Sequence, residues 1–323
     1  MKWLVAREMW ENKGSLLWAP LIVAALIVLF VSFTASYGIF SGQLANGGVV
    51  VNGTHVDFVT KFAQMPPDTR ASLVRSIASG YLSVAAPLLI VLTGVVFFYC
   101  LGALYEERRD RSILFWKSLP ISDQATVLSK VATALVVAPV ITIFIGIVMS
   151  VILLLLGALL LAFKGINLFG LLATTPALYL TPLTVVALLP IYILWALPTV
   201  GWLLMVSAWA KSKVFLWAVG VPILLAIVVQ WTRFMAPPGL DIRWYLENVL
   251  FRGLGGLVPG IWMAADDINV RLLVHAGENT INISGILLES YMLLGRPQIW
   301  IGALVGAAMI YAAIKLRRWK DEG

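Results

Sequence analysis

VATALVVAPVITIFIGIVMSVILLLLGALLLAF, residues 131–163, contains no charged side chain and no continuous polar face. Soluble helices carry a polar stripe, and this run does not. About 20 apolar residues are enough to cross a hydrocarbon core roughly 30 Å thick. The run therefore predicts a membrane-spanning helix. Because it is longer than one straight crossing requires, we expect it to tilt or to extend beyond the bilayer.

Comparable apolar runs recur along the 323 residues, of which 61% are hydrophobic and only 12% charged. The chain is therefore expected to be an all-α integral membrane protein with six transmembrane helices in one domain. The predicted spans cover residues 17–40, 81–104, 127–162, 178–209, 214–232 and 298–315. Prolines recur at steps of eight residues in the fourth span, and each is expected to kink or interrupt that helix. They are Pro182, Pro190 and Pro198.

The distribution of basic residues orients these spans. If both termini are cytoplasmic, 14 of the 23 Lys and Arg residues fall in the short cytoplasmic segments or at the inner ends of the spans. This bias follows the positive-inside rule. The net charge of +7 is then explained by topology, and no nucleic-acid partner is predicted.

The N-terminal residues 1–16 mix Trp3, Leu4 and Trp10 with charged side chains. This mixture predicts a short helix that lies in the membrane interface, in contact with lipid, ahead of the first span. An unstructured tail is the alternative.

Two long segments are predicted to lie outside. In residues 41–80, a Gly- and Asn-rich stretch favours turns and a short hairpin. The external loop 233–297 contains DIRWYLENVLFRGL, residues 241–254, with apolar residues at helical spacing. Two interpretations fit this pattern: an amphipathic helix lying on or dipping into the outer leaflet, and a small helix packed on the bundle.

Few charges fall within the predicted spans. Among Asp, Glu, Lys, Arg and His, only Lys130 and Lys315 lie there, each near an inner end. Ion-coupled transporters and voltage sensors place charges inside the membrane, so neither class is predicted. The chain also has no G-x-x-x-x-G-K-[ST] run for binding ATP, so energy for any driven process must enter from another polypeptide.

Catalytic and metal-binding groups are equally sparse. His55 and His275 have no partners at metal-ligand or catalytic spacing, and Asp266-Asp267 is an isolated acidic pair. Cys100 is the single cysteine, which excludes an intrachain disulfide. We therefore predict no metal site, no cofactor bound by this chain and no enzymatic activity of its own.

One predicted cytoplasmic loop, residues 105–126, concentrates charge and aromatic side chains in YEERRDRSILFWKSLPISD, residues 105–123. A stop-transfer cluster explains the charges alone. It does not explain residues 113–116, four consecutive large apolar residues whose burial is worth roughly 1.5–3 kcal/mol each. A helix is expected to end just before Pro120, because the residue that precedes a proline disfavours the helical conformation. Ser122 or Asp123 can then cap the start of the next helix. The loop is therefore expected to form a helix, a break, a short amphipathic element, a Pro turn and a capped helix.

This loop resembles that of the type-2 permeases, the membrane subunits of ATP-binding-cassette (ABC) exporters. The matching elements are Glu106-Glu107-Arg108, Ile113-Leu114-Phe115-Trp116, Ser118-Leu119-Pro120-Ile121-Ser122 and Lys130. The overall layout is also similar: an N-terminal interfacial helix, six spans, a tight hairpin between spans four and five and a large outer loop. Many members have a glycine after the basic pair, where this chain has Asp110-Arg111-Ser112.

The resemblance implies a coupling helix in residues 105–126 that sits in a cleft of a separate ABC ATPase subunit. It implies a dimer with a second permease, identical or not, in a bacterial plasma membrane, and it places ATP and Mg on the partner ATPase. We expect a lipophilic or amphiphilic cargo. The predicted ATPase-docking residues are Glu106, Glu107, Arg108, Arg109, Arg111, Phe115, Trp116, Lys117 and Pro120. The alternative is a non-transporting scaffold that recruits a soluble partner through the same loop.

Overall fold

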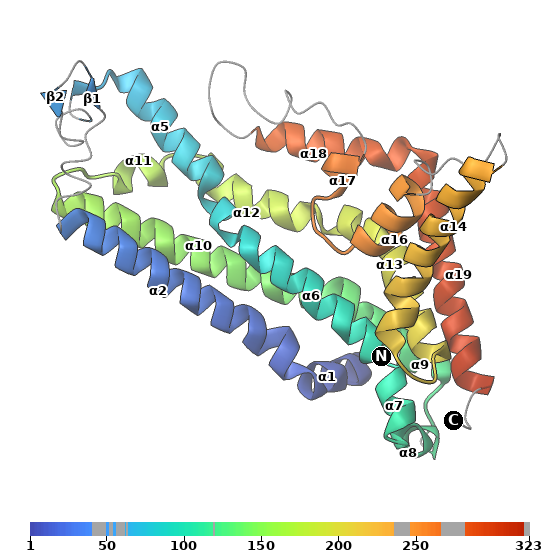
Figure 1. Ribbon diagram of the computed structural model, residues 1–323. Coiled ribbons are helices and arrows are strands. Elements are labelled where there is room, and N and C mark those ends of the chain that lie inside the picture. Colours follow the sequence, from blue (N-terminus) through green and yellow to red (C-terminus); the bar gives the residue numbers. More distant parts are fainter. Residues whose placement is uncertain are drawn as a thin grey trace.

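The computed structural model describes residues 1–40, 50–51, 54–55, 62, 64–118, 120–235, 246–265 and 282–319. This part of the chain is helical apart from one antiparallel pair of short strands, β1 (Val50–Val51) and β2 (Thr54–His55). The pair lies within residues 41–80, where a short hairpin was expected. The protein is thus an all-α fold with a minimal hairpin at one end (Figure 1).

The first half of the chain supplies three long helical arms. Their elements are α1 (Lys2–Glu11), η1 (Gly14–Trp18), α2 (Ala19–Phe40), α5 (Pro67–Gly80), η2 (Tyr81–Ala85), α6 (Ala86–Gly102), α7 (Tyr105–Arg109), α8 (Ser112–Ser118), α9 (Asp123–Ala132), η3 (Thr133–Val137) and α10 (Ala138–Phe163). Figure 1 shows α2 lying along α10 over most of their length.

The second half forms the other side of the bundle. Its elements are α11 (Phe169–Ala173), α12 (Ala177–Ala187), α13 (Leu189–Trp209), η4 (Leu216–Gly220), α14 (Val221–Met235), η5 (Leu246–Phe251), α16 (Arg252–Gly255), α17 (Trp262–Ala265), α18 (Ile283–Met292), η7 (Leu293–Gly295) and α19 (Pro297–Trp319). We call the end that carries α7 and α8 the basal end, and the end that carries α17 and α18 the distal end (Figure 1).

Five helices are long and apolar enough to cross a membrane, which supports the prediction of an all-α membrane protein. They are Gly14–Gly38, Pro67–Arg109, Asp123–Phe163, Ala177–Trp209 and Pro297–Trp319. The predicted span at 214–232 corresponds to a shorter apolar helix, Leu216–Trp231, so the count of six spans stays a prediction. The Asp123–Phe163 helix has 41 residues, which confirms that it exceeds one straight crossing.

The fourth predicted span is interrupted at Leu188, between α12 and α13. Pro190 lies in the first turn of α13, where a missing backbone N–H costs no helical hydrogen bond. Pro182 and Pro198 lie inside α12 and α13 respectively. The chain thus divides this span beside the middle proline of the three.

The centre of the core is α13, whose Val200, Leu203 and Leu204 are fully buried. Helix α13 packs closely along α19. A Cβ atom on Gly201 would lie 2.5 Å from the carbonyl oxygen of Gly306, and a Cβ on Gly306 would lie 2.7 Å from the carbonyl carbon of Leu197. Glycines at this crossing let the two backbones touch, as small residues do between membrane helices.

The described part of the predicted external loop packs on the bundle. Leu257 is fully buried and its carbonyl accepts a hydrogen bond from Thr93 Oγ1 at 3.3 Å. Trp262 is 2% exposed, and its Nε1 donates to Ser290 Oγ at 3.1 Å. Within residues 241–254, η5 contacts α14 and α16 contacts α13, which favours the interpretation of a helix packed on the bundle. Residues 241–245 of the same stretch lie outside the described part of the chain.

Candidate functional site

The loop between the second and third predicted spans forms two short helices, α7 and α8, at the basal end. Helix α7 ends at a turn in which Arg111 has φ 57°, the left-handed region that favours glycine. The turn is made by an arginine, at a steric cost. Helix α8 then ends at Ser118, two residues before Pro120.

The next helix begins with the expected cap. Ser122 is the N-cap of α9, and its side chain accepts a hydrogen bond from the Ala125 N–H at 3.2 Å. This satisfies one of the amide groups left open at a helix start. Of the two capping residues predicted, Ser122 has this role and Asp123 is the first helical residue.

A largely buried group of charged side chains lies directly behind this loop. We call it the basal ion cluster: Arg7, Glu8, Glu11, Glu107, Asp123, Lys130 and Arg317. Its residues come from α1, α7, α9 and α19. Segments that are up to 210 positions apart in sequence are therefore joined by charge pairing.

Lys130 is at the centre of the cluster. Its Nζ lies 2.9 and 3.1 Å from the two carboxylate oxygens of Glu8 and 2.9 Å from Glu107 Oε1. The Lys130 side chain is 4% exposed and that of Glu8 is 1% exposed. Tyr99 donates a hydrogen bond from its hydroxyl to Glu8 Oε2 at 2.9 Å, so both oxygens of this buried carboxylate are satisfied.

Glu107 connects α7 to the C-terminal helix. Its Oε2 accepts a hydrogen bond from Arg317 Nη1, while Arg317 Nε donates to Asp123 Oδ1 at 3.1 Å. The Arg317 side chain is 3% exposed. One guanidinium thus bridges the helix that precedes the loop's turn and the helix that follows it.

Arg7 extends the cluster to α8. Its Nη2 pairs with Glu8 Oε1 at 2.7 Å, and its guanidinium carbon lies 3.9 Å from the centre of the Trp116 ring. This is a cation–π contact between α1 and α8. Ile113 is 3% exposed, so α8 is held by an apolar contact as well as by the arginine.

A second attachment joins the loop to the end of α13. Arg108 Nη2 donates to the carbonyl oxygens of Ser207 and Ala210 at 2.6 and 2.9 Å. Ser207 Oγ in turn accepts hydrogen bonds from the backbone N–H groups of Leu104 and Tyr105 at 3.1 and 3.0 Å. A cation at a helix C-terminus is favourable because the last carbonyls there lack intrahelical partners.

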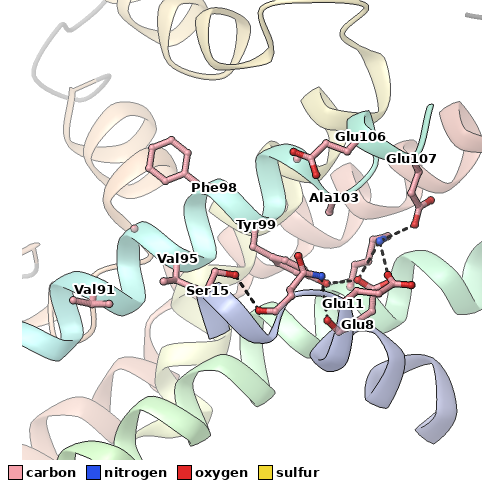
Figure 2. Close-up of a pocket in the computed structure, with 14 residues that line it drawn as sticks. Glu8, Glu11, Ser15, Val91, Val95, Phe98, Tyr99, Ala103, Glu106 and Glu107 are labelled. Carbon is pink, nitrogen blue, oxygen red and sulfur yellow. Dashed lines mark hydrogen bonds and ion pairs between the residues drawn. The ribbon is translucent and has the colours of Figure 1, made fainter. Parts of the chain in front are cut away.

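A cavity of about 650 Å³ opens beside the cluster, between α1 and α6 (Figure 2). Its lining includes four carboxylates, from Glu8, Glu11, Glu106 and Glu107, and apolar side chains of α6. Partial burial raises the pKa of the Glu11 carboxyl, and Arg7 acts in the opposite direction. Glu8 and Glu107 pair with Lys130, and Figure 2 shows Glu106 projecting away from Glu8 and Glu107.

The predicted docking residues therefore fall into groups. Glu107 and Arg108 are turned into the bundle by the contacts above, and Trp116 is half-buried against Arg7. The side chains of Glu106, Arg109, Arg111 and Pro120 are exposed. Phe115 and Lys117 belong to α8, but their side chains lie outside the described part of the structure.

The structure adds residues that sequence reasoning did not assign to this site, above all Glu8, Arg317 and Tyr99. A signal for them was available. A lysine in an apolar helix needs a buried anion, and Glu8 is an acid close to the start of the first span. Nothing in local sequence spacing, however, pairs residues 122 positions apart.

The described residues contain no group of three or more His, Cys, Asp or Glu side chains arranged to hold a metal ion. Among the described residues, the site consists of ion pairs next to the α7–α8 loop. Comparison of the chain with protein-family models, with characterised proteins and with solved structures gives no match.

Proposed function

We propose that this chain is the membrane subunit of an ABC exporter and that α8 is the element through which a separate ATPase drives it. The observation that carries the proposal is the attachment of the α7–α8 loop. Ion pairs and hydrogen bonds link it to α1, α9, α13 and α19. A displacement of α8 by a partner would thus be passed to helices of both sides of the bundle.

The contacts separate two roles within the predicted docking set. Arg109, Arg111 and Pro120 are exposed and are suited to contact an ATPase, with Glu106 beside them. Glu107 and Arg108 are suited to transmit the motion, because each fastens α7 to another helix. Charged rim residues typically set register and association rate, and buried pairs resist separation.

A sixth crossing is part of this proposal. Elements η4 and α14 run continuously from Leu216 to Met235. At 1.5 Å per residue they extend about 30 Å, which equals the thickness of a typical hydrocarbon core. Both termini would then lie on the side of α8, in the cytoplasm of a bacterium.

The transported molecule would pass between two such subunits, in a homodimer or a heterodimer. ATP and Mg would bind to the ATPase partners, and their closure would shift the bundle between inward- and outward-facing states. The scarcity of charge along the spans favours a lipophilic or amphiphilic cargo.

The test is first whether a neighbouring gene encodes a P-loop ATPase, and then whether that ATPase co-purifies with this chain and hydrolyses ATP with it in vesicles. Charge reversal of the exposed pair, Arg109→Glu with Arg111→Glu, is expected to reduce ATPase co-purification at least about tenfold. Glu107→Gln is expected to leave co-purification intact and to lower cargo-stimulated turnover. A Phe115→Ala/Trp116→Ala double variant should lose both.

A control comes from an exposed pair that belongs to neither α7 nor α8. Lys211→Glu with Lys213→Glu makes the same charge change on the turn between α13 and η4, and co-purification should be unaffected. Equal loss in both reversed pairs would contradict docking through α8. Co-purification of a non-ATPase protein with no nucleotide-dependent transport would instead favour the scaffold alternative.

A further inference from the structure

A second cavity, of about 460 Å³, lies at the distal half of α19, far from the basal ion cluster. It is bounded by α13, α14, α16 and α19. Most of its walls are apolar, from residues such as Trp202, Leu225 and Val305. Among the described residues that line it, Arg252 carries the charge.

Arg252 is held in a defined position at this cavity. Its guanidinium carbon lies 4.5 Å from the centre of the Trp195 ring, and Trp195 is 3% exposed. A Cβ atom on Gly302 would lie 2.5 Å from Arg252 Nη2, so any other residue at position 302 would require the guanidinium to shift. The backbone is fixed too, because Thr199 Oγ1 donates to the Arg252 carbonyl at 3.2 Å.

This placement puts a permanent positive charge inside the bundle. Gly302 lies in the second turn of α19 from its distal end, within a helix long and apolar enough to cross a membrane. Arginine does not deprotonate in proteins. A charge at membrane depth is costly and is kept where it has a functional partner. None of the predicted spans contains this residue, since it enters the bundle on the short helix α16.

The cavity has a polar end and an apolar end. Its α19 wall is one stripe from Gln298 to Met309, with Arg252 and Gln298 near the distal end. The rise along helix α19 from Gln298 to Met309 is about 16 Å, close to half of a hydrocarbon core about 30 Å thick. From Arg252 the apolar wall therefore runs toward the middle of the span, which is the direction in which an acyl chain extends from its phosphate.

We propose that this cavity binds an acidic phospholipid of the distal leaflet, with its phosphate at Arg252 and an acyl chain along the Val305–Met309 wall. Charge complementarity favours an anionic headgroup over a zwitterionic one, since choline would add a second cation near the guanidinium. The apolar walls favour an attached chain over free phosphate. The inference is independent of the proposed transport function, because lipid binding needs no ATPase.

The experiment is native mass spectrometry of the full chain, purified in a neutral detergent and mixed with dioleoyl phosphatidylglycerol and dioleoyl phosphatidylcholine. One phosphatidylglycerol should remain per chain, preferred about tenfold, as expected for one charge-assisted hydrogen-bonded contact. Arg252→Gln should bind the two lipids equally. Glycerol phosphate, which has the anion without the chains, should not compete.

Two tryptophan variants keep the test valid if Arg252→Gln does not fold. Val305→Trp fills the cavity and should reduce phosphatidylglycerol retention at least about tenfold. Leu304→Trp adds similar bulk at a neighbouring position that is 71% exposed and outside the cavity, and retention should be unchanged. Equal retention by the two tryptophan variants, equal binding of both lipids by the unaltered chain, or displacement by glycerol phosphate would overturn the proposal.

Discussion

Replacing Lys130 by methionine tests the basal ion cluster most directly, because this lysine touches both of its central carboxylates. The three N–O distances of 2.9, 3.1 and 2.9 Å to Glu8 and Glu107 bring it into full contact with each. At an effective dielectric constant near 20, each contact at this range corresponds to about 6 kcal/mol of gross attraction. Desolvation of the buried ions offsets most of that gain.

The Lys130→Met variant keeps the length of the side chain but leaves Glu8 and Glu107 without their shared cation. Removing one partner of a buried pair costs about 3–5 kcal/mol. Without Lys130, the two arginines of the cluster, Arg7 and Arg317, face the four carboxylates of Glu8, Glu11, Glu107 and Asp123. The unfolding equilibrium should therefore change by between about a hundredfold and a few thousandfold. Denaturant titration of the purified protein, followed by tryptophan fluorescence, measures this change.

The double variant Lys130→Met/Glu8→Gln separates charge pairing from packing. With the buried carboxylate neutralised, the double variant should be more stable than Lys130→Met alone, and the two changes should be non-additive by at least about 1 kcal/mol. Lys315→Met is the control. In the described structure Lys315 contacts only the ring face of Tyr311, at 5.4 Å from the ring centre. The loss of this contact should cost at most about 1 kcal/mol. A loss for Lys130→Met no larger than that of the control would refute the reasoning.

Two further predictions concern the backbone. Gly306→Ala places a methyl group against the Leu197 carbonyl carbon and should lower the unfolding free energy by about 1–3 kcal/mol in denaturant titration. The control is Gly157→Ala, whose added Cβ atom would have no neighbouring atom within 4 Å. It should leave the stability unchanged or raise it by up to about 1 kcal/mol. Equal changes in stability for the two variants would show that the α13–α19 contact can separate enough to accommodate a methyl group at no cost. The Arg111→Gly variant should be at least as stable as the unaltered chain, because only glycine adopts the φ of 57° at this position without strain. The Arg111→Val variant should lose about 1–2 kcal/mol of unfolding free energy. Equal stability of the two variants would contradict a strained turn.

The sequence alone was sufficient for features set by local composition. The apolar run 131–163 predicted a long spanning helix, and Pro120 with Ser122 predicted the end of α8 and the start of α9. These features depend on a few neighbouring residues, whose backbone preferences do not need the rest of the fold. The short helices of the 105–126 loop were expected for the same reason.

Features made by long-range pairing were not predictable in this way. Lys130 was visible as a charge in an apolar helix, yet its partner Glu8 lies in a segment assigned to the membrane interface. Arg252 was counted as part of an external helix, although its guanidinium lies against Trp195 inside the bundle. In both cases the packing of helices that are distant in sequence determines which residue is the partner. The helical periodicity of a single segment does not predict that packing.

The basal ion cluster also has an order in time, since its members are synthesised far apart. Arg7 and Glu8 leave the ribosome first, Lys130 follows, and Arg317 comes 210 residues after Glu107. At a synthesis rate of about 5–20 residues per second, Arg317 is added roughly ten seconds or more after Glu107 and Asp123. The cluster can be completed only once α19 has been inserted and packed against α13. Its closure therefore marks the moment at which a newly made chain has become a whole bundle.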